Sequence, residues 1–158
     1  MNSKTRSLTY GAVIAALYVA LTLIVNSLGL ASGIIQIRLS EALTILPLFT
    51  PAAVPGLFVG CVLANVLTGC ALWDVIFGSL ATLIGALGTW KLAKNKWMAP
   101  LFPILSNAII VPFVLQYVYA FEGSYWYFFL TVGLGEVISC GVLGILLHNA
   151  LKRTPLFK

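Results

Sequence analysis

Residues 8–25, LTYGAVIAALYVALTLIV, decide the class of fold, because this segment contains no charged side chain. It lies within a longer uncharged interval, residues 7–37, and two further intervals, 42–73 and 97–121, also lack Asp, Glu, Lys and Arg. A helix that crosses a lipid bilayer needs about 20 predominantly apolar residues. Each of these intervals therefore has room for at least one transmembrane helix.

The composition of the whole chain leads to the same class. Of its 158 residues, 61% are hydrophobic and only 8% are charged, whereas soluble domains carry about 25% charged residues. So few charges could not cover the surface of a soluble domain of this size. The apolar runs are continuous rather than alternating, which favours helices over the strands of a membrane barrel. We therefore expect one all-α integral membrane domain that covers residues 1–158.

Turn-forming segments divide the apolar sequence into about six helices of membrane-spanning character. The breaks fall at TP (50–51), TGCALW (68–73), KLAKNK (91–96) and EGS (122–124). Residues 27–40 alternate between polar and apolar side chains, which predicts an extended loop outside the bilayer. The predicted helices cover residues 8–25, 39–49, 51–67 (with a start at Pro51 or Pro55), 73–92, 98–121 and 125–151.

The basic residues indicate the orientation of these helices, since lysine and arginine gather on the cytoplasmic side of membrane proteins. If six helices alternate from a cytoplasmic N-terminus, eight of the nine basic residues fall inside and only Arg38 falls outside. The eight are Lys4, Arg6, Lys91, Lys94, Lys96, Lys152, Arg153 and Lys158. Both termini are therefore predicted to be cytoplasmic. The net charge of +5 then reflects topology, and no nucleic-acid partner is expected.

Polar side chains from five predicted helices converge on the outward half of the bundle. An ionisable group at the centre of a membrane helix costs about 2.5–3.5 kcal/mol, so such groups are functional candidates. The candidates are Arg38 in the outer loop, Glu41, Asn65 and Asp74 toward the outer helix ends, and Asn107 and Glu136 nearer the midplane. Because the inner half is almost purely apolar, this asymmetry predicts a binding cavity open to the outside.

Each candidate also has a purely structural interpretation. Asp74 could be an acid favoured by the dipole at a helix N-terminus, and Glu41 could simply pair with Arg38. The two asparagines could join neighbouring helices by hydrogen bonds. Glu136 has the weakest structural interpretation, because no basic residue within the membrane can pair with it. A protonated acid bonded to a neighbouring helix is the alternative for this residue.

Aromatic residues enrich the same side of the predicted bundle. Trp73 and Trp126 could line a cavity for a planar, hydrogen-bonding heterocycle, or they could belong to an interfacial belt. The three cysteines, Cys61, Cys70 and Cys140, match no metal-binding spacing and are expected to be packing residues. The sequence contains neither a phosphate-binding GxxxxGK[ST] loop nor an HExxH motif. We therefore expect a binding protein without enzyme activity, metal or cofactor, which takes energy from partner proteins.

Small residues repeat every four positions on several predicted helices. In the first helix, Ala12, Ala16 and Ala20 form one stripe, and this spacing lets helix backbones approach closely in a membrane. Similar stripes contain Gly56, Gly60 and Ala64, and also Ala81 and Gly85. Any of these stripes could pack inside the bundle. The alanine stripe is the best candidate for docking another membrane protein, because the opposite side of its helix is large and apolar.

Three segments of the chain together resemble a known family. They are RLSEAL (38–43), GLFVGCVLAN (56–65) and DVIFGSLATL (74–83). With the six predicted helices, the long first outer loop and the alanine stripe, the chain looks like an S component of an energy-coupling factor (ECF) transporter. More specifically, it resembles the queuosine-precursor transporter family, often called QueT. The likeness covers essentially the whole chain.

The resemblance implies capture of a 7-deazaguanine, such as queuine or its 7-aminomethyl precursor. It also implies a multi-pass protein of the cell membrane, in complex with a membrane scaffold subunit and two cytoplasmic ATPase subunits. Ala12, Ala16 and Ala20 would contact the scaffold subunit. The carboxylates would receive the N–H groups of a guanine-like edge and the amides would serve its carbonyl. Two alternatives are an S component for another vitamin or heterocycle, and a structural membrane protein without a substrate.

Overall fold

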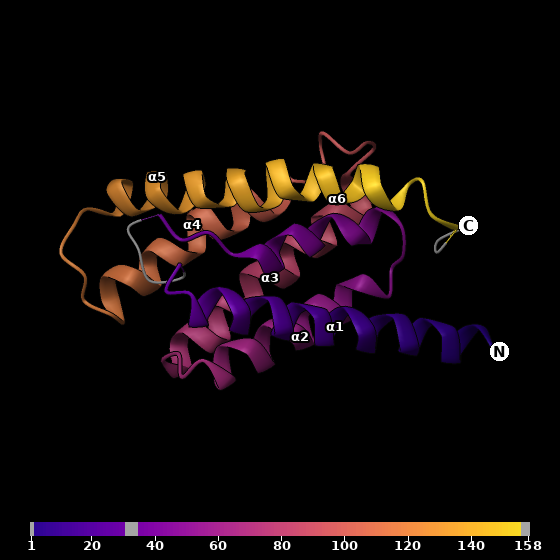
Figure 1. Cartoon of the computed structure of the whole chain (residues 1–158). Coiled ribbons are helices and arrows are strands. Elements are labelled where there is room, and N and C mark those ends of the chain that lie inside the picture. Colours follow the sequence, from indigo (N-terminus) through magenta and orange to yellow (C-terminus); the bar gives the residue numbers. More distant parts are fainter. Residues whose placement is uncertain (1, 31–34, 156–158) are drawn as a thin grey trace.

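The computed structural model describes residues 2–30 and 35–155, and within these ranges every regular element is helical. The elements are α1 (Ser3–Ser27), η1 (Leu39–Leu48), α2 (Ala53–Leu67), α3 (Leu72–Leu92), α4 (Leu101–Tyr117), α5 (Tyr125–Glu136), η2 (Val137–Leu143) and α6 (Gly144–Leu151). The all-α class is therefore confirmed. The chain folds as a bundle in which α1 lies on one side and the continuous rod of α5, η2 and α6 lies on the other (Figure 1).

The short element η1 occupies the interior of this bundle. It contacts α1, α3, α6 and η2, and residues 40–47 are all buried. It is a 3₁₀ helix and contains Pro47, which lacks the N–H that a continuing α-helix would use. The predicted helix 39–49 is thus present, but in a tighter form.

The lengths of the helices differ from the prediction in places. Three segments are long and apolar enough to cross a bilayer, namely Ser3–Ser27, Leu72–Leu92 and Tyr125–Leu151. The other apolar helices, η1, α2 and α4, are shorter. The predicted helix 98–121 begins later and ends earlier, because α4 covers only Leu101–Tyr117 and the backbone turns at Ala120 with a φ of 52°. Six complete membrane passes therefore remain a prediction.

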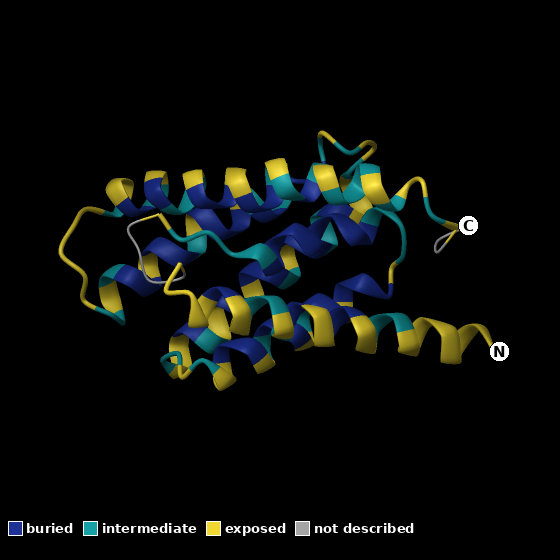
Figure 2. Ribbon diagram, viewed as in Figure 1, coloured by how far each residue is buried: buried dark blue, intermediate teal, exposed yellow. Residues whose placement is uncertain are grey.

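Both chain termini lie toward one end of the bundle (Figure 1). The start of α1 and the end of α6 lie at the same end of the molecule (Figure 1), as the predicted even number of passes requires. The cytoplasmic location of that end is still a prediction, and Lys158 and part of the predicted outer loop lie outside the described residues. Figure 2 shows that the outward faces of the helices are largely exposed. Many of these exposed side chains are large and apolar, which suits contact with lipid.

Two of the small-residue stripes serve packing within the bundle. A Cβ atom added at Gly60 would lie 2.8 Å from Cβ of Tyr18 on α1. A Cβ atom at Gly85 would lie 2.6 Å from Cα of Pro103 on α4. These helices approach so closely that only glycine fits at the contact. The stripe on α1 does not pack within the bundle, because Ala12, Ala16 and Ala20 are all exposed.

Candidate functional site

A polar cavity of about 180 Å³ opens at the end of the bundle away from the termini. It lies where α1, α2 and α4 end, where α3 begins, and where the chain leads into η1. Most of the residues that line it have polar side chains: Thr22, Asn26, Gln36, Arg38, Ser40, Asn65, Thr68, Cys70, Asp74 and Tyr119, with Val25, Val111, Leu115 and Phe121 completing the wall. Three predicted site residues, Arg38, Asn65 and Asp74, therefore meet in one cavity.

The turn between α2 and α3 places Asp74 at this cavity. Gly69 has a φ of 74°, a conformation that favours glycine, and it lets the N–H of Cys70 donate to the carbonyl of Asn65 at 3.0 Å. The chain then reverses, so that Asp74, in the first turn of α3, lies close to the end of α2. A Cβ atom added at Gly78 would lie 3.3 Å from both Nδ2 of Asn65 and Oδ1 of Asp74. The glycine thus leaves room where the amide and the carboxylate approach each other.

Tyr119 orients the carboxylate of Asp74. Its hydroxyl donates to Oδ2 of Asp74 at 2.9 Å and accepts from the N–H of Ala71 at 3.2 Å. Partial burial and the neighbouring Asp74 raise the pKa of Tyr119 to about 12. The phenol therefore remains a hydrogen-bond donor at neutral pH. Asp74 also lies in the first turn of α3, where the helix dipole favours a negative charge.

Arg38 brings the positive charge of the site. Its guanidinium Nη2 donates to Oε1 of Gln36 at 3.3 Å, and its backbone N–H donates to Oγ of Ser139 at 3.1 Å. Burial disfavours the charged form, but Tyr18, Asp74 and Glu41 outweigh this effect, and the pKa of Arg38 is raised. Within the described ranges, no carboxylate lies within 4 Å of this guanidinium. The simple Glu41–Arg38 ion pair, one structural interpretation of Glu41, is therefore not formed.

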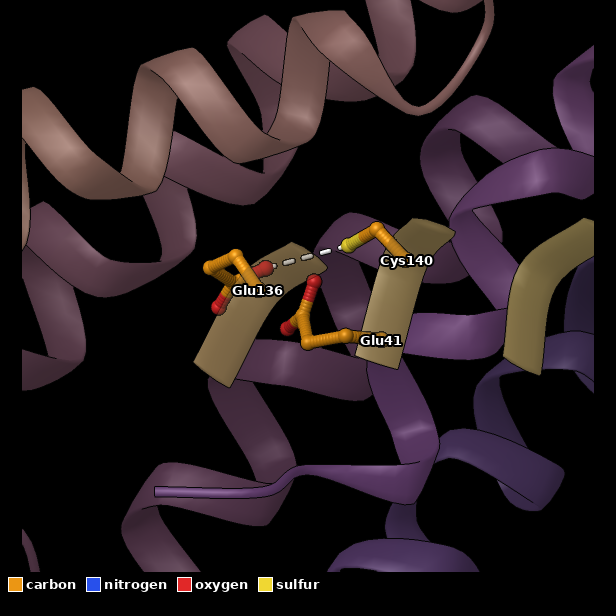
Figure 3. Close-up of side chains that lie close together, drawn as sticks. All are labelled: Glu41, Glu136 and Cys140. Carbon is orange, nitrogen blue, oxygen red and sulfur yellow. Dashed lines mark hydrogen bonds between the residues drawn. The ribbon is translucent and has the colours of Figure 1, made fainter. Parts of the chain in front are cut away.

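A second group of polar side chains lies deeper in the bundle. Glu41, Glu136 and Cys140 are all buried, and one ligand atom from each lies within 4.8 Å of the other two. Figure 3 shows the two carboxylates and the thiol turned toward one another. Cys140 Sγ donates to Oε2 of Glu136 at 3.0 Å, and the hydroxyl of Tyr18 donates to Oε1 of Glu41. We call Glu41, Glu136 and Cys140 the deep acidic cluster; by position, its atoms could hold a small cation.

Two buried polar atoms near this cluster make no hydrogen bond within the described structure. They are Oε2 of Glu41 and Nδ2 of Asn107. Glu41 is only 1% exposed and Asn107 only 4% exposed. A buried polar group without a partner costs about 1–3 kcal/mol. These atoms are therefore candidates for hydrogen bonds to a bound ligand.

Glu136 occupies a special place in its helix. It is the last residue of α5, and η2, a π-helical segment, follows at once. Such wider turns inside helices are frequent at functional sites. The residue before Glu136, Gly135, packs so tightly against the carbonyl of Gln36 that a Cβ atom would not fit. The close approach at Gly135 holds the loop before η1 against the helix that carries Glu136.

The structure separates the two predicted tryptophans from the cavity. Trp73 is 56% exposed and Trp126 is 70% exposed, and neither lines the cavity. Trp73 stacks on Phe77, with ring centroids 5.9 Å apart, on an outward face of α3. The aromatic side chains at the cavity are instead Tyr119 and Phe121.

Sequence reasoning did not select several residues that the structure brings to the site. Tyr18, Thr22 and Asn26 lie along one face of α1: the first bonds to Glu41, and the other two line the cavity. Their four-residue spacing was a usable signal, because residues at i and i+4 share a helix face. Cys140, expected to be only a packing residue, also lies one turn from Glu136 and bonds to it.

A shallow apolar groove lies between α1 and α2 near the start of α1. It has a volume of about 570 Å³. Its lining includes Leu8, Gly11 and Ala12 of α1, together with Pro55 and Val59 of the second helix. The exposed alanine stripe thus borders a surface that another apolar helix could cover.

Comparisons with known proteins agree with the sequence resemblance. The family model described as QueT transporter matches residues 8–153. The chain is 29% identical to the queuosine precursor transporter QueT of Lactococcus lactis subsp. cremoris (strain MG1363), and the aligned region covers 98% of each protein. No solved structure matches the chain.

Proposed function

This chain belongs to the QueT transporter family, and we propose that it is the substrate-binding subunit of an importer for a queuosine precursor. Membership in this family makes it a multi-pass membrane transport protein rather than an enzyme. The single observation that carries the proposed binding role is the polar cavity in which Arg38, Asn65 and Asp74 meet.

The proposed substrate is a 7-deazaguanine, either queuine or a 7-aminomethyl-7-deazaguanine-like base. A guanine-like edge offers adjacent N–H donors and a carbonyl acceptor. The carboxylate of Asp74, oriented by Tyr119, suits the N–H donors. The amide of Asn65 or the guanidinium of Arg38 suits the carbonyl, and the aromatic face of Phe121 can cover the ring.

The proposed direction of capture follows from the placement of the cavity. The cavity opens at the end of the bundle opposite the termini. The positive-inside rule favours cytoplasmic termini, since the basic residues flank the helix ends on that side. The substrate would therefore enter from the extracellular side.

The proposed energy source lies in partner proteins. The chain has no phosphate-binding loop of its own, so ATP would be hydrolysed by the two cytoplasmic ATPases of an ECF module. The membrane scaffold subunit would dock on the exposed stripe of Ala12, Ala16 and Ala20 and on the adjoining groove. Small residues on an exposed face support this role, because they permit close contact between helices in lipid.

Ligand binding by the purified full-length protein in detergent tests the proposed function. We expect saturable binding of 7-aminomethyl-7-deazaguanine or queuine by isothermal titration calorimetry. Asp74→Asn should weaken binding at least about tenfold, since hydrogen bonds to charged groups contribute about 1.5–3 kcal/mol. Trp126→Ala is the matched control, because this side chain is 70% exposed and lies outside the cavity. Equal affinities of wild type and Asp74→Asn would exclude this site.

Mass spectrometry of small molecules that copurify with the protein separates the alternatives. A different heterocycle in the purified protein would indicate an S component of other specificity. Absence of any ligand, together with no thermal stabilisation by deazaguanines, would favour a structural membrane protein.

A further inference from the structure

The deep acidic cluster lies deeper in the bundle than the cavity, and no basic side chain of the described residues forms an ion pair with it. The carboxylates of Glu41 and Glu136 face the same small region, together with the thiol of Cys140 (Figure 3). Oε2 of Glu41 makes no hydrogen bond although the residue is 1% exposed. In the part of the chain that the structure describes, no basic side chain lies within 4 Å of either carboxylate. Oε2 of Glu41 can therefore accept a hydrogen bond from one more donor.

The charges of the two carboxylates favour a donor that is positively charged. Two carboxylates that share a buried site cannot both stay ionised without compensation, because each charge disfavours the other. The nearest positive charge, Arg38, also faces Asp74 at the cavity, so three acids share one guanidinium. A buried charge is tolerated when it is paired and hydrogen-bonded. A ligand that brings a positive charge and several N–H donors would both pair with the carboxylates and form hydrogen bonds with them.

The cluster lies next to residues of the cavity wall on α1 and η1, since Ser40 precedes Glu41 in the chain. Thr22 and Ser40 line the cavity, and the hydroxyl of Thr22 donates to that of Ser40 at 2.9 Å. Tyr18, the partner of Glu41, lies one helical turn below Thr22 on α1. One helical turn rises about 5.4 Å, and Glu41 and Glu136 do not line the cavity itself. A short arm on a base in the cavity would therefore reach them where the Thr22–Ser40 pair separates.

We propose that Glu41 and Glu136 form a subsite for a protonated amine on the substrate. An ammonium group has three N–H donors, of which one would bind Oε2 of Glu41 and another the carboxylate of Glu136. The cavity above would hold the ring. This proposal rests on the proposed function, and it adds that the protein selects a base with a charged aminomethyl arm over the same base with a neutral arm.

A comparison of two bases tests this selection at pH 7. The probes are 7-aminomethyl-7-deazaguanine, whose arm is charged, and 7-cyano-7-deazaguanine, whose arm is neutral, each titrated into the purified full-length protein by calorimetry. We expect the aminomethyl base to bind at least about tenfold more tightly. Glu41→Gln and Glu136→Gln should each reduce that preference to about twofold or less, while the cyano base keeps its wild-type affinity.

Control measurements separate a failure of the ammonium subsite from a failure of the proposed function. Binding of the cyano base shows that a variant is folded, and Glu122→Gln removes an exposed acid outside the cluster, so it should leave both affinities unchanged. If neither base binds to the wild type, the proposed function fails. If both bind equally, or if the preference survives in both glutamine variants, the ammonium subsite is wrong and the proposed function stands. Tight zinc binding that Glu136→Gln abolishes, without amine selection, would identify a metal site instead and overturn this proposal.

Discussion

The carboxylate of Asp74 has a structural place in its helix and a proposed role in binding. It lies in the first turn of α3, where an acid is favourable for the helix, and it also lines the cavity. The hydroxyl of Tyr119 binds one of its oxygens at 2.9 Å. The other oxygen is turned toward the space beside Gly78 and Asn65. The structural interpretation of Asp74 and its proposed binding role are therefore compatible.

Removal of the Tyr119 hydroxyl tests this arrangement. Tyr119→Phe should raise the dissociation constant for a deazaguanine by about threefold to tenfold, because the carboxylate loses the donor that fixes its position. Calorimetry on the purified protein measures the effect, and Tyr117→Phe, on a 74% exposed side chain, is the control. An unchanged affinity would mean that Asp74 needs no such support.

The same tyrosine predicts a dependence of stability on pH. The pKa of Tyr119 is raised from its ordinary value of 10.0 to about 12, so the folded protein holds this proton more tightly than the unfolded chain. The resulting stabilisation is complete below pH 10 and is lost as the pH rises toward 12. Thermal unfolding of wild type and Tyr119→Phe should therefore converge over this alkaline range. A constant difference in melting temperature would contradict the prediction.

At the scale of elements, the contact between α1 and α2 determines where the polar face of α1 points. Gly60 allows α2 to approach the backbone of Ala15 and the side chain of Tyr18. Tyr18 is buried by this contact and donates its hydroxyl to Glu41. The small residues of α2 therefore support the deep acidic cluster through helix packing rather than through chemistry of their own.

Gly60→Ala should destabilise the protein by about 1–3 kcal/mol, because the added methyl group overpacks a closed contact. It would lie 2.8 Å from Cβ of Tyr18 and 3.0 Å from Cα of Ala15. Unfolding in mixed micelles measures the change. Gly133→Ala is a matched control, since its nearest neighbour would be Cβ of Ala108 at 3.9 Å, and it should be neutral or slightly stabilising. Equal stability of the two variants would contradict the close contact.

Across the whole bundle, the proposed binding and docking surfaces are separate. The cavity lies at one end of the bundle, whereas the alanine stripe runs along the exposed side of α1. A protein that captures substrate and passes it on with the help of partners needs both surfaces. Their separation also means that one can be altered without the other.

Ala16→Trp should abolish association with a membrane scaffold subunit while ligand affinity stays within about twofold of wild type. The large ring would prevent a close helix contact on an exposed face of α1. Copurification of the coexpressed scaffold subunit and calorimetry measure the two effects. Leu130→Trp, at a 62% exposed position on α5, should leave both unchanged. Retained association of Ala16→Trp would place the docking surface elsewhere.

The all-helical membrane class and the approximate position of each helix followed from the sequence alone, because the length of an apolar run is a local property. The sequence also pointed to Arg38, Asn65 and Asp74 as candidates, since polar groups are conspicuous in apolar sequence. Which of these groups meet depends on the tertiary structure. It gathered those three residues at the cavity, placed Glu41 and Glu136 beside Cys140, and left Trp73 and Trp126 on the outside. The physical reason is that a membrane helix is apolar on both its inward and its outward face, so its rotation is set by packing against neighbours such as Gly60 and Tyr18.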